Sequence, residues 1–189
     1  MNIAENELIR LCKRKNAKAQ KLLYNNYHSI LLGICLRYGK SRAEAEDTLQ
    51  QGMITIFKKI NSYSGKGSFE GWLKKIMVNT AIDNFRKNNK FYNHQNIDEL
   101  NGKSYFNSNT SNNMEVQDLM STIQQLPPGY RMVFNLFAIE GYSHKEIAKK
   151  LGISENTSKT QLLKARKNLK EKLELLDKLP SQIYNNERR

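Results

Sequence analysis

The only tryptophan of the chain, Trp72, falls on a charged side of the helix that its surroundings predict. At about 100° per residue, the segment 71–90 (GWLKKIMVNTAIDNFRKNNK) divides into an apolar side and a polar side. A large aromatic ring beside cations can face an anionic partner or pack half-buried on another helix, and the residues alone favour neither. The polar side, which we call the Trp72 stripe, consists of Trp72, Lys75, Asn79, Asp83, Arg86 and Lys90.

A second cationic surface is predicted in the C-terminal half of the chain. One helix begins at a capping box, Ser143 with Glu146, and ends at Gly152, and the next begins after Ser154. Two helices joined by so short a turn fit the helix-turn-helix plan. The apolar back of the second helix holds Leu162, Ala165, Leu169 and Leu173, with Ser158 among them. Its front, which we call the lysine stripe, consists of Lys159, Thr160, Leu163, Lys164, Lys167 and Lys170.

The lysine stripe has the composition of a surface that enters the major groove of DNA. Its lysines would bind phosphates, while Thr160 and Leu163 could touch base edges or a thymine methyl group. The alternative is a solvated, Lys-rich helix in an ordinary bundle. The turn, the cap and the spacing together favour DNA binding.

Net charge also indicates an anionic partner. The 189 residues include 31 Lys+Arg against 18 Asp+Glu, a formal charge of +13. Residues 1–90 hold 17 basic and 7 acidic groups, so the excess is concentrated there. Nucleic acid or a membrane surface would suit this charge, and the alternative is a soluble basic protein with neither partner.

Cysteine usage and hydropathy limit the expected compartment of the protein and the kinds of site that it could contain. Cys12 and Cys35 lie among apolar residues and no Cys or His pair has metal-ligand spacing, so we expect buried thiols in a reducing compartment, no metal and no cofactor. The longest apolar run, 30–36, is too short to span a bilayer, and the N-terminus lacks a signal-peptide pattern. These features predict a cytoplasmic protein without membrane insertion.

Helical patterns recur along the chain and strand signals do not, which predicts an all-α protein. The second predicted helix places Leu23, Ile30 and Ile34 on its apolar side, and a capping box, Ser41 with Glu44, begins the third. The expected helices cover 5–15, 17–38, 41–60, 69–90, 114–126, 127–141 and 143–152, with a last one from 154 and a loop over 61–68.

Composition changes between the two helical parts. From 88 to 113 the chain is crowded with Asn and Ser and has no sustained apolar period, which is typical of a flexible linker. We expect the last helix to end near Pro180, and the tail has no functional interpretation. The predicted organisation is two small helical domains, 1–90 and 115–179, joined by a flexible polar linker, 91–114, and followed by a tail, 180–189.

Two segments resemble a known family, the extracytoplasmic-function group of sigma-70-type sigma factors. Residues 45–88 (AEDTLQQGMITIFKKINSYSGKGSFEGWLKKIMVNTAIDNFRKN) resemble the core of sigma region 2. Residues 126–169 (LPPGYRMVFNLFAIEGYSHKEIAKKLGISENTSKTQLLKARKNL) resemble sigma region 4. Either segment alone would be suggestive, but both in this order on either side of a polar linker are highly specific.

The resemblance implies that both domains dock on core RNA polymerase. One domain would bind the −10 promoter element and help to open it, and the other would bind the −35 element. The chain would be a monomer on polymerase; relatives are commonly restrained by an anti-sigma factor, which no motif here identifies. By the same likeness the polymerase clamp would contact the helix that bears Asp47, Gln50, Gln51 and Ile54, a pattern that a plain amphipathic helix would also explain.

The resemblance also implies a role for the Trp72 stripe, because the matching helix of the family faces the strand being separated. Unpaired bases need a flat face for stacking, worth about 1–3 kcal/mol per base, with phosphates held alongside. Asn79 and Asp83 could read base edges, while Arg86 and Lys87 would neutralise phosphates. The likeness thus favours a DNA-facing indole.

Within the loop 61–68, residues 62–68 (SYSGKGS) correspond to the segment that in relatives captures a base turned out of the stack. Gly65 and Gly67 would permit close approach of the backbone. The candidate −10 residues are therefore Ser64, Gly65, Lys66, Trp72, Lys75, Asn79, Asp83, Arg86 and Lys87.

The second domain departs from the family pattern at three positions. Ser158 puts a hydroxyl on the packed side, where we expect it to bond back to a carbonyl one turn earlier. Gln161 stands where relatives often have arginine, and Leu163 where they commonly have a polar or basic residue. The candidate −35 residues are Asn156, Thr157, Lys159, Thr160, Leu163, Lys164 and Lys167.

Other functions remain as alternatives. A stand-alone helix-turn-helix regulator would bind duplex DNA without polymerase. An enzyme acting on nucleic acid would need a carboxylate cluster or an activated nucleophile, and His28, His94 and His144 have no partner by spacing, so we expect no catalytic site. An adaptor without DNA contact would leave the charge of residues 1–90 unexplained.

Overall fold

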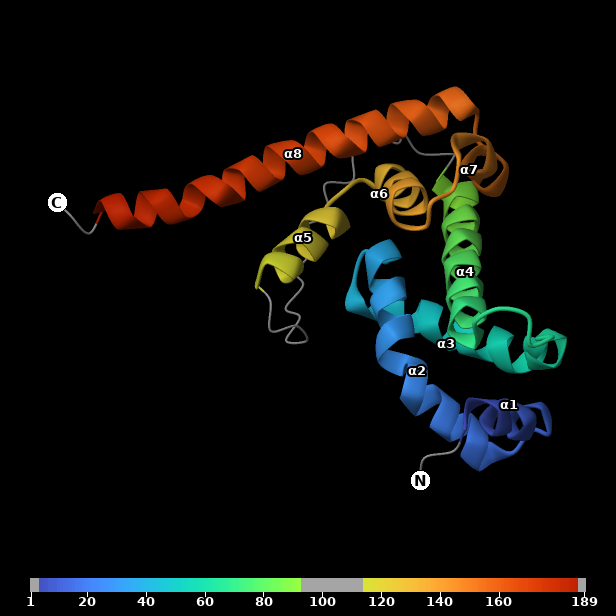
Figure 1. Cartoon of the computed structure of the whole chain (residues 1–189). Coiled ribbons are helices and arrows are strands. Elements are labelled where there is room, and N and C mark those ends of the chain that lie inside the picture. Colours follow the sequence, from blue (N-terminus) through green and yellow to red (C-terminus); the bar gives the residue numbers. More distant parts are fainter. Residues whose placement is uncertain (1–3, 93–113, 187–189) are drawn as a thin grey trace. The chain divides into compact units, whose positions relative to one another are not determined.

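A computed structural model describes the backbone of residues 4–92 and 114–186, and the side chains of residues 4–88 and 119–174. Across these residues the chain is helical and has no strand, which confirms the predicted all-α class (Figure 1). Most of the predicted linker, 93–113, lies outside the described residues.

The chain divides into two compact units, Met1–Tyr92 (unit 1) and Asn93–Arg189 (unit 2). Each unit has its own buried apolar residues, as expected for two small helical domains. None of the helices that the structure describes is both long and apolar enough to cross a membrane.

Unit 1 is a small helical bundle. Helices α2, α3 and α4 pack against one another, and α1 packs on α2 and on the turn that follows α3 (Figure 1). Its fully buried interior includes Leu23, Leu31, Ile56, Leu73 and Met77. The elements are α1 (Glu5–Lys13), α2 (Ala17–Tyr38), α3 (Arg42–Lys59), the 3-10 turn η1 (Ile60–Ser62) and α4 (Phe69–Tyr92).

One glycine allows α3 and α4 to approach closely. A Cβ atom at Gly52 would overlap the thioether of Met77. A larger residue at this position would force the end of the Met77 side chain to move within the close-packed interior. Because the Met77 sulfur also lies 4.0 Å from the Cys35 sulfur, the same side chain joins α4 to α2.

Unit 2 is organised around the start of its last helix. Helix α8 packs on α5, α6 and α7. Ile123, Leu126, Ala165 and Leu169 form a buried cluster, with the ring of Tyr130 against it. The elements are α5 (Met114–Gln124), α6 (Pro128–Phe134), the π turn η2 (Asn135–Ile139), α7 (His144–Leu151) and α8 (Glu155–Asn186).

The predicted caps are found, with one difference. Ser143 and Glu146 form a complete capping box at the start of α7. At α3, the Ser41 hydroxyl accepts the Glu44 N–H at 3.2 Å, but the Glu44 carboxylate accepts from the backbone of Lys40 at 2.6 Å rather than from Ser41. The serine cap is therefore present there, and the reciprocal bond moves one residue earlier.

Two expectations from the helical pattern are wrong. Ile30 is 43% exposed, because the buried side of α2 runs along Leu31, Ile34 and Cys35 and leaves Ile30 at its edge. Helix α8 continues to Asn186 instead of ending near Pro180. An interior proline removes one backbone donor and crowds the carbonyl four residues earlier, which disfavours a helix by about 3 kcal/mol without forbidding it.

Candidate nucleic-acid interface

Trp72 is half-buried at the start of α4. Its indole stacks on Phe69, with ring centroids 5.8 Å apart and planes inclined by 14°. Tyr63 contacts the indole from a tilted angle at 5.5 Å. Phe69 is buried, whereas Trp72 keeps partial exposure. Packing therefore holds the ring in position and leaves part of it open to solvent.

The loop before α4 is exposed at its tip and fixed at its ends. Ser64, Gly65 and Lys66 are exposed. Gly65 and Gly67 have φ of 78° and 79°, a left-handed conformation that favours glycine. The Tyr63 hydroxyl donates to the Gly67 carbonyl at 2.8 Å and so joins the two ends of the loop. The sequence predicts these glycines for close approach of the backbone. Nothing lies within 4 Å of a Cβ atom built on either of them, so it is their left-handed backbone conformation, and not a close neighbour, that requires glycine.

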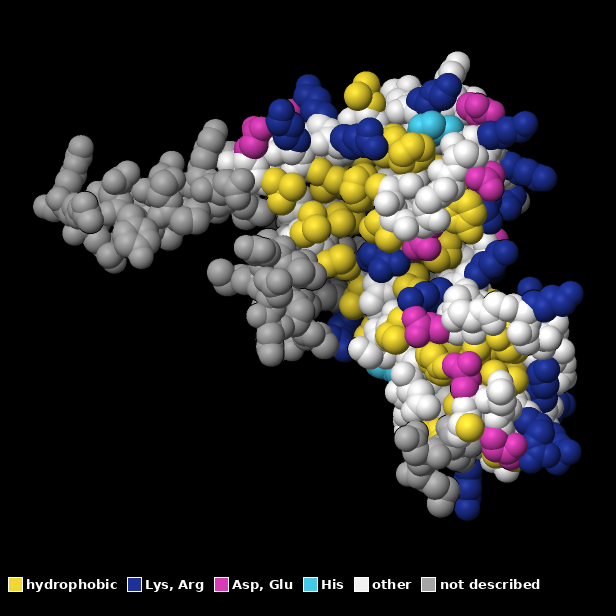
Figure 2. Space-filling model, viewed as in Figure 1, with side chains coloured by type: hydrophobic (Ala, Val, Ile, Leu, Met, Phe, Trp, Pro, Cys, Tyr) yellow, Lys and Arg dark blue, Asp and Glu magenta, His cyan; other side chains and the backbone are white. Residues whose placement is uncertain are grey.

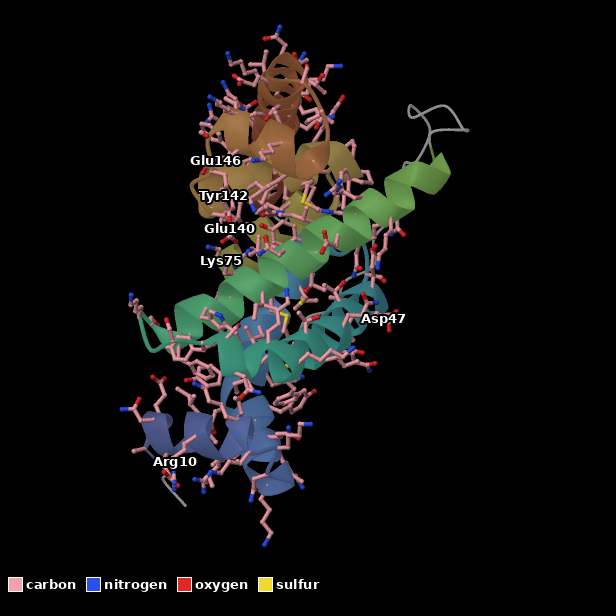
Figure 3. The ribbon with its side chains drawn as sticks, turned by 90° about the vertical axis from the view of Figure 1, so that its right-hand side faces the viewer. Arg10, Asp47, Lys75, Glu140, Tyr142 and Glu146 are labelled. Atoms are coloured by element: carbon pink, nitrogen blue, oxygen red, sulfur yellow. The ribbon has the colours of Figure 1, made fainter. Side chains whose placement is uncertain are left out.

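The rest of the Trp72 stripe follows the outer side of α4. Lys75, Asp83 and Arg86 are exposed, and Asn79 is half-exposed. Figure 3 shows Lys75 projecting from α4. Lys87 is exposed as well. The side chain of Lys90 lies outside the described residues. Cations thus accompany the indole along α4.

The lysine stripe of α8 presents an apolar side chain among its cations. Leu163 is 70% exposed, more than any other large apolar side chain that the structure describes. The Thr160 hydroxyl donates to the Asn156 carbonyl at 2.9 Å, so it can still accept a hydrogen bond but its proton is already used. Lys159 is exposed beside them. The front of α8 therefore offers apolar contact and positive charge rather than many donors to bases.

The remaining cations of the lysine stripe are held loosely. The Lys164 ammonium lies 5.9 Å from the centre of the Tyr130 ring. Lys167 lies 3.9 Å from Glu171 in an exposed ion pair, which is worth little in water and can give way to a phosphate. Asn156 and Thr157 are exposed at the start of the helix. Figure 2 shows Lys and Arg side chains along α8.

The helix-turn-helix geometry depends on a polar contact that the sequence did not predict. Ser158 is fully buried, and its hydroxyl lies 2.9 Å from Nδ1 of His144. The expected bond back to a helix carbonyl is thus replaced by one between α7 and α8. The His144 ring also stacks on Phe137, with centroids 4.6 Å apart. Gly152 makes the turn with φ of 71°.

Gln161 lies against α6 rather than on the cationic front. Its side-chain amide would be 3.1 Å from a Cβ atom built on Gly129. The residue is half-buried, whereas Lys159 and Lys164 are exposed. The position where relatives often have arginine is therefore used for helix packing in this chain.

The outer face of α3 carries the residues matched to polymerase contact. Asp47, Gln50 and Gln51 are exposed, and Ile54 is 54% exposed. Figure 3 shows Asp47 at the outer edge of α3. A single exposed apolar side chain is ordinary on a protein surface, so the geometry of this face carries no signal of its own for a partner.

The two thiols pack inside unit 1. Burial raises the pKa of the Cys35 thiol to about 12 and raises that of Cys12 as well. Both are free cysteines, as expected. Within the described residues, no three His, Cys, Asp or Glu side chains lie together as a metal site.

Profiles of known protein families match both units. The profile described as "Sigma-70 region 2" matches residues 23–91, and "Sigma-70, region 4" matches residues 117–169. The first match includes the Trp72 stripe and the exposed face of α3, but begins after α1. The second includes the helix-turn-helix and the lysine stripe.

Several curated proteins are similar over nearly the whole chain. The ECF RNA polymerase sigma-E factor of Haemophilus influenzae is 24% identical over 92% of this chain and 97% of its own length. The RNA polymerase sigma-H factor of Pseudomonas aeruginosa is 22% identical over 91% and 95%. The ECF RNA polymerase sigma factor SigE of Mycolicibacterium smegmatis is 26% identical over 74% of this chain but only 56% of that longer relative.

A solved structure supports the fold. The sigma factor RpoE of Bartonella quintana, in complex with the anti-sigma factor NepR, aligns with a TM-score of 0.52 at 19% identity. The alignment covers 82% of this chain and 96% of the other. At this identity the likeness concerns the arrangement of helices and not the residues of a site.

Proposed function

Because the chain belongs to the extracytoplasmic-function group of the sigma-70 family of RNA polymerase sigma factors, we propose that it directs core polymerase to specific promoters and helps to open the −10 element. The observation that carries the proposal is the half-buried indole of Trp72 beside an exposed glycine loop and a row of cations. This arrangement suits a separated strand better than a duplex.

At the −10 element, Trp72 would stack on an unpaired base. Phe69 supports the indole from below, so the ring needs little reordering when a base arrives. The loop around Ser64, Gly65 and Lys66 would receive a base turned out of the stack, and Asn79 would contact base edges. Phosphates would be neutralised by Lys75, Arg86 and Lys87, with Asp83 available to accept from a base amino group.

At the −35 element, α8 would enter the major groove of intact duplex. Lys159, Lys164 and Lys167 would bind phosphates, and Leu163 would contact bases. Asn156 and Thr157 lie at the N-terminus of α8, where backbone N–H groups also favour a phosphate.

Core polymerase would contact the outer face of α3. Asp47, Gln50, Gln51 and Ile54 lie together there, and Ile54 supplies the apolar contact that such a surface needs. We propose that the chain acts in the cytoplasm as a monomer on polymerase. It would have no catalytic site or cofactor of its own, because the polymerase performs the chemistry. Inhibition by an anti-sigma factor would follow the example of the Bartonella protein.

Transcription in vitro tests the proposal. Core polymerase and a candidate promoter are incubated with and without this chain, and both the transcript and permanganate-reactive thymines at −10 are measured. Transcript and unpaired thymines should depend on the chain. A chain that binds duplex tightly by itself and never supports initiation would instead be a stand-alone helix-turn-helix regulator.

A further inference from the structure

Helix α1 contacts the loop that precedes the Trp72 stripe, although it lies outside the segment that matches sigma region 2. The ammonium of Lys13 donates to the backbone carbonyl of Tyr63 at 2.9 Å. The two residues are 50 positions apart in sequence, and the bond is partly buried. A charge-assisted bond of this kind is stronger than a bond between neutral groups.

Tyr63 is the residue from which the exposed loop starts. Its hydroxyl donates to Gly67 at the far end of the loop. Its ring lies 5.0 Å from Phe69 and 5.5 Å from Trp72. The Lys13 bond therefore acts on Tyr63, which begins the loop and also contacts the indole of Trp72.

Helix α1 is itself well placed to hold this position. Leu8, Ile9 and Cys12 are buried against the rest of unit 1. The Tyr27 hydroxyl donates to Glu5 at 2.8 Å, and the Tyr27 ring meets Phe69 edge-on. Both ends of α1 are thus connected to the aromatic residues beneath the indole.

We propose that Lys13 is a positioning residue for base capture: by holding the Tyr63 carbonyl it presets the loop 64–67 and the indole for an unpaired nucleotide. The inference rests on the proposed function. Two glycines in left-handed conformations make alternative loop shapes accessible, so a loop without this bond would pay an ordering cost each time it bound a base. Lys13 reaches the site through Tyr63 and needs no contact with DNA.

The test uses holoenzyme formed from core polymerase and the full chain. Lys13→Met removes the donor and keeps the apolar stem, while Lys13→Arg restores a donor and the charge. Tyr63→Phe removes the bond to Gly67 and serves as an independent variant of the same loop. Lys18→Met, at an exposed lysine of unit 1, is the matched loss of charge.

We expect Lys13→Met and Tyr63→Phe to open the −10 element about tenfold less than wild type by permanganate reactivity, since each loses one specific hydrogen bond. Affinity for polymerase should stay close to wild type, and the melting temperature should fall by no more than the few degrees that one lost hydrogen bond costs. Lys13→Arg should recover most of the opening, and Lys18→Met should behave as wild type. Because Trp72 is the only tryptophan, acrylamide quenching of its fluorescence in the isolated chain should increase in Lys13→Met.

Three results would overturn the inference. Equal opening of the −10 element by wild type and Lys13→Met would show that the Lys13 bond has no effect on base capture. Parallel losses of opening, polymerase affinity and melting temperature would show a general structural role. A shallower dependence of DNA affinity on salt would show that Lys13 contacts a phosphate. If wild type itself opened no promoter while quenching still increased in Lys13→Met, the proposed function would fail and the Lys13 contact would stand as structure alone.

Discussion

The Trp72 stripe of α4 and the lysine stripe of α8 both place cations on the outer side of a helix, but only the first has an aromatic ring among them. In unit 1 the ring rests on Phe69 beside a glycine loop. In unit 2 the corresponding place is taken by Leu163, which is 70% exposed. A supported flat ring suits separated bases, whereas a protruding aliphatic side chain suits the floor of a major groove. The two surfaces therefore carry the same kind of charge. They are distinguished by the uncharged side chain among the cations, which is Trp72 in one and Leu163 in the other.

The largest expected effect is on strand separation. Replacing Trp72 with Ala should reduce opening of the −10 element by about 10- to 100-fold, because stacking is worth about 1–3 kcal/mol per base. Polymerase binding should change little. Permanganate footprinting and a polymerase pull-down measure the two quantities on the same samples. Trp72→Phe is the matched control, since it keeps a flat ring, and equal losses of opening and polymerase binding would refute the melting role.

A smaller effect is expected at Leu163 on duplex DNA. Leu163→Ala should weaken binding to −35 duplex about fivefold, as expected for losing an apolar contact of about 1 kcal/mol. Uracil in place of thymine removes the methyl group from the DNA side. Wild type should therefore lose affinity at one or two uracil positions, and Leu163→Ala should lose nothing more there.

Fluorescence anisotropy on a uracil scan of the −35 duplex measures this coupling. Leu163→Met keeps an apolar side chain and should retain the sensitivity to uracil. A scan in which no uracil position weakens wild-type binding would exclude the contact with a thymine methyl group. The same scan on single-stranded −10 DNA should be insensitive to Leu163, which separates the two surfaces.

Lys164→Ala should produce a still smaller loss of duplex affinity. Removing one phosphate contact should reduce the slope of log affinity against log salt by about 0.9. Lys172 in the same helix is the control, because it is partly buried and its ammonium donates to Gln125 at 2.9 Å. Lys172→Ala should leave the salt slope unchanged. An unaltered slope in Lys164→Ala would argue against a phosphate contact there.

A separate prediction concerns the stability of unit 1 at alkaline pH rather than its binding to DNA. The Cys35 thiol, with its pKa raised to about 12 by burial, stays neutral in the folded state while the unfolded chain ionises it from its ordinary pKa of about 8.5 upward. Its contribution to stability is therefore lost as the pH rises between these two values. Cys35→Ala should show a smaller loss of stability over this range. Urea unfolding followed by Trp72 fluorescence reports on unit 1 alone, and an identical loss in both proteins would contradict the assignment.

Much of the helical architecture could be predicted from local pattern. The capping box of Ser143 and Glu146, the turn at Gly152 and the start of α4 at Phe69 each depend on residues near one another in the chain. Such signals act within one or two helical turns, so the sequence contains them directly. Ile30 shows the limit, because its burial depends on which neighbour covers that edge of α2.

The candidate sites show the same division between features that have a local signal in the sequence and contacts that depend on packing. Periodicity correctly placed the exposed row of α8, since exposure on a helix repeats with its turn, and the family resemblance named the exposed residues of α3. It missed the support of Trp72 by Phe69 and Tyr63, although Phe69 precedes the indole by one turn. It also missed the pairing of Ser158 with His144. The contacts of Tyr63 with the indole and of Ser158 with His144 join different elements and have no local signature, whereas Phe69 and Trp72 are neighbours on one side of α4.

By itself the sequence determined the all-helical class, the two sigma-type segments and the side chains available on each exposed stripe. Tertiary structure alone decided that Tyr63 packs on the indole of Trp72, that Lys13 holds Tyr63 from 50 residues away, and that Gln161 turns to α6. The reason is physical: helix periodicity determines which side chains share a face, whereas contacts between faces depend on how the helices pack.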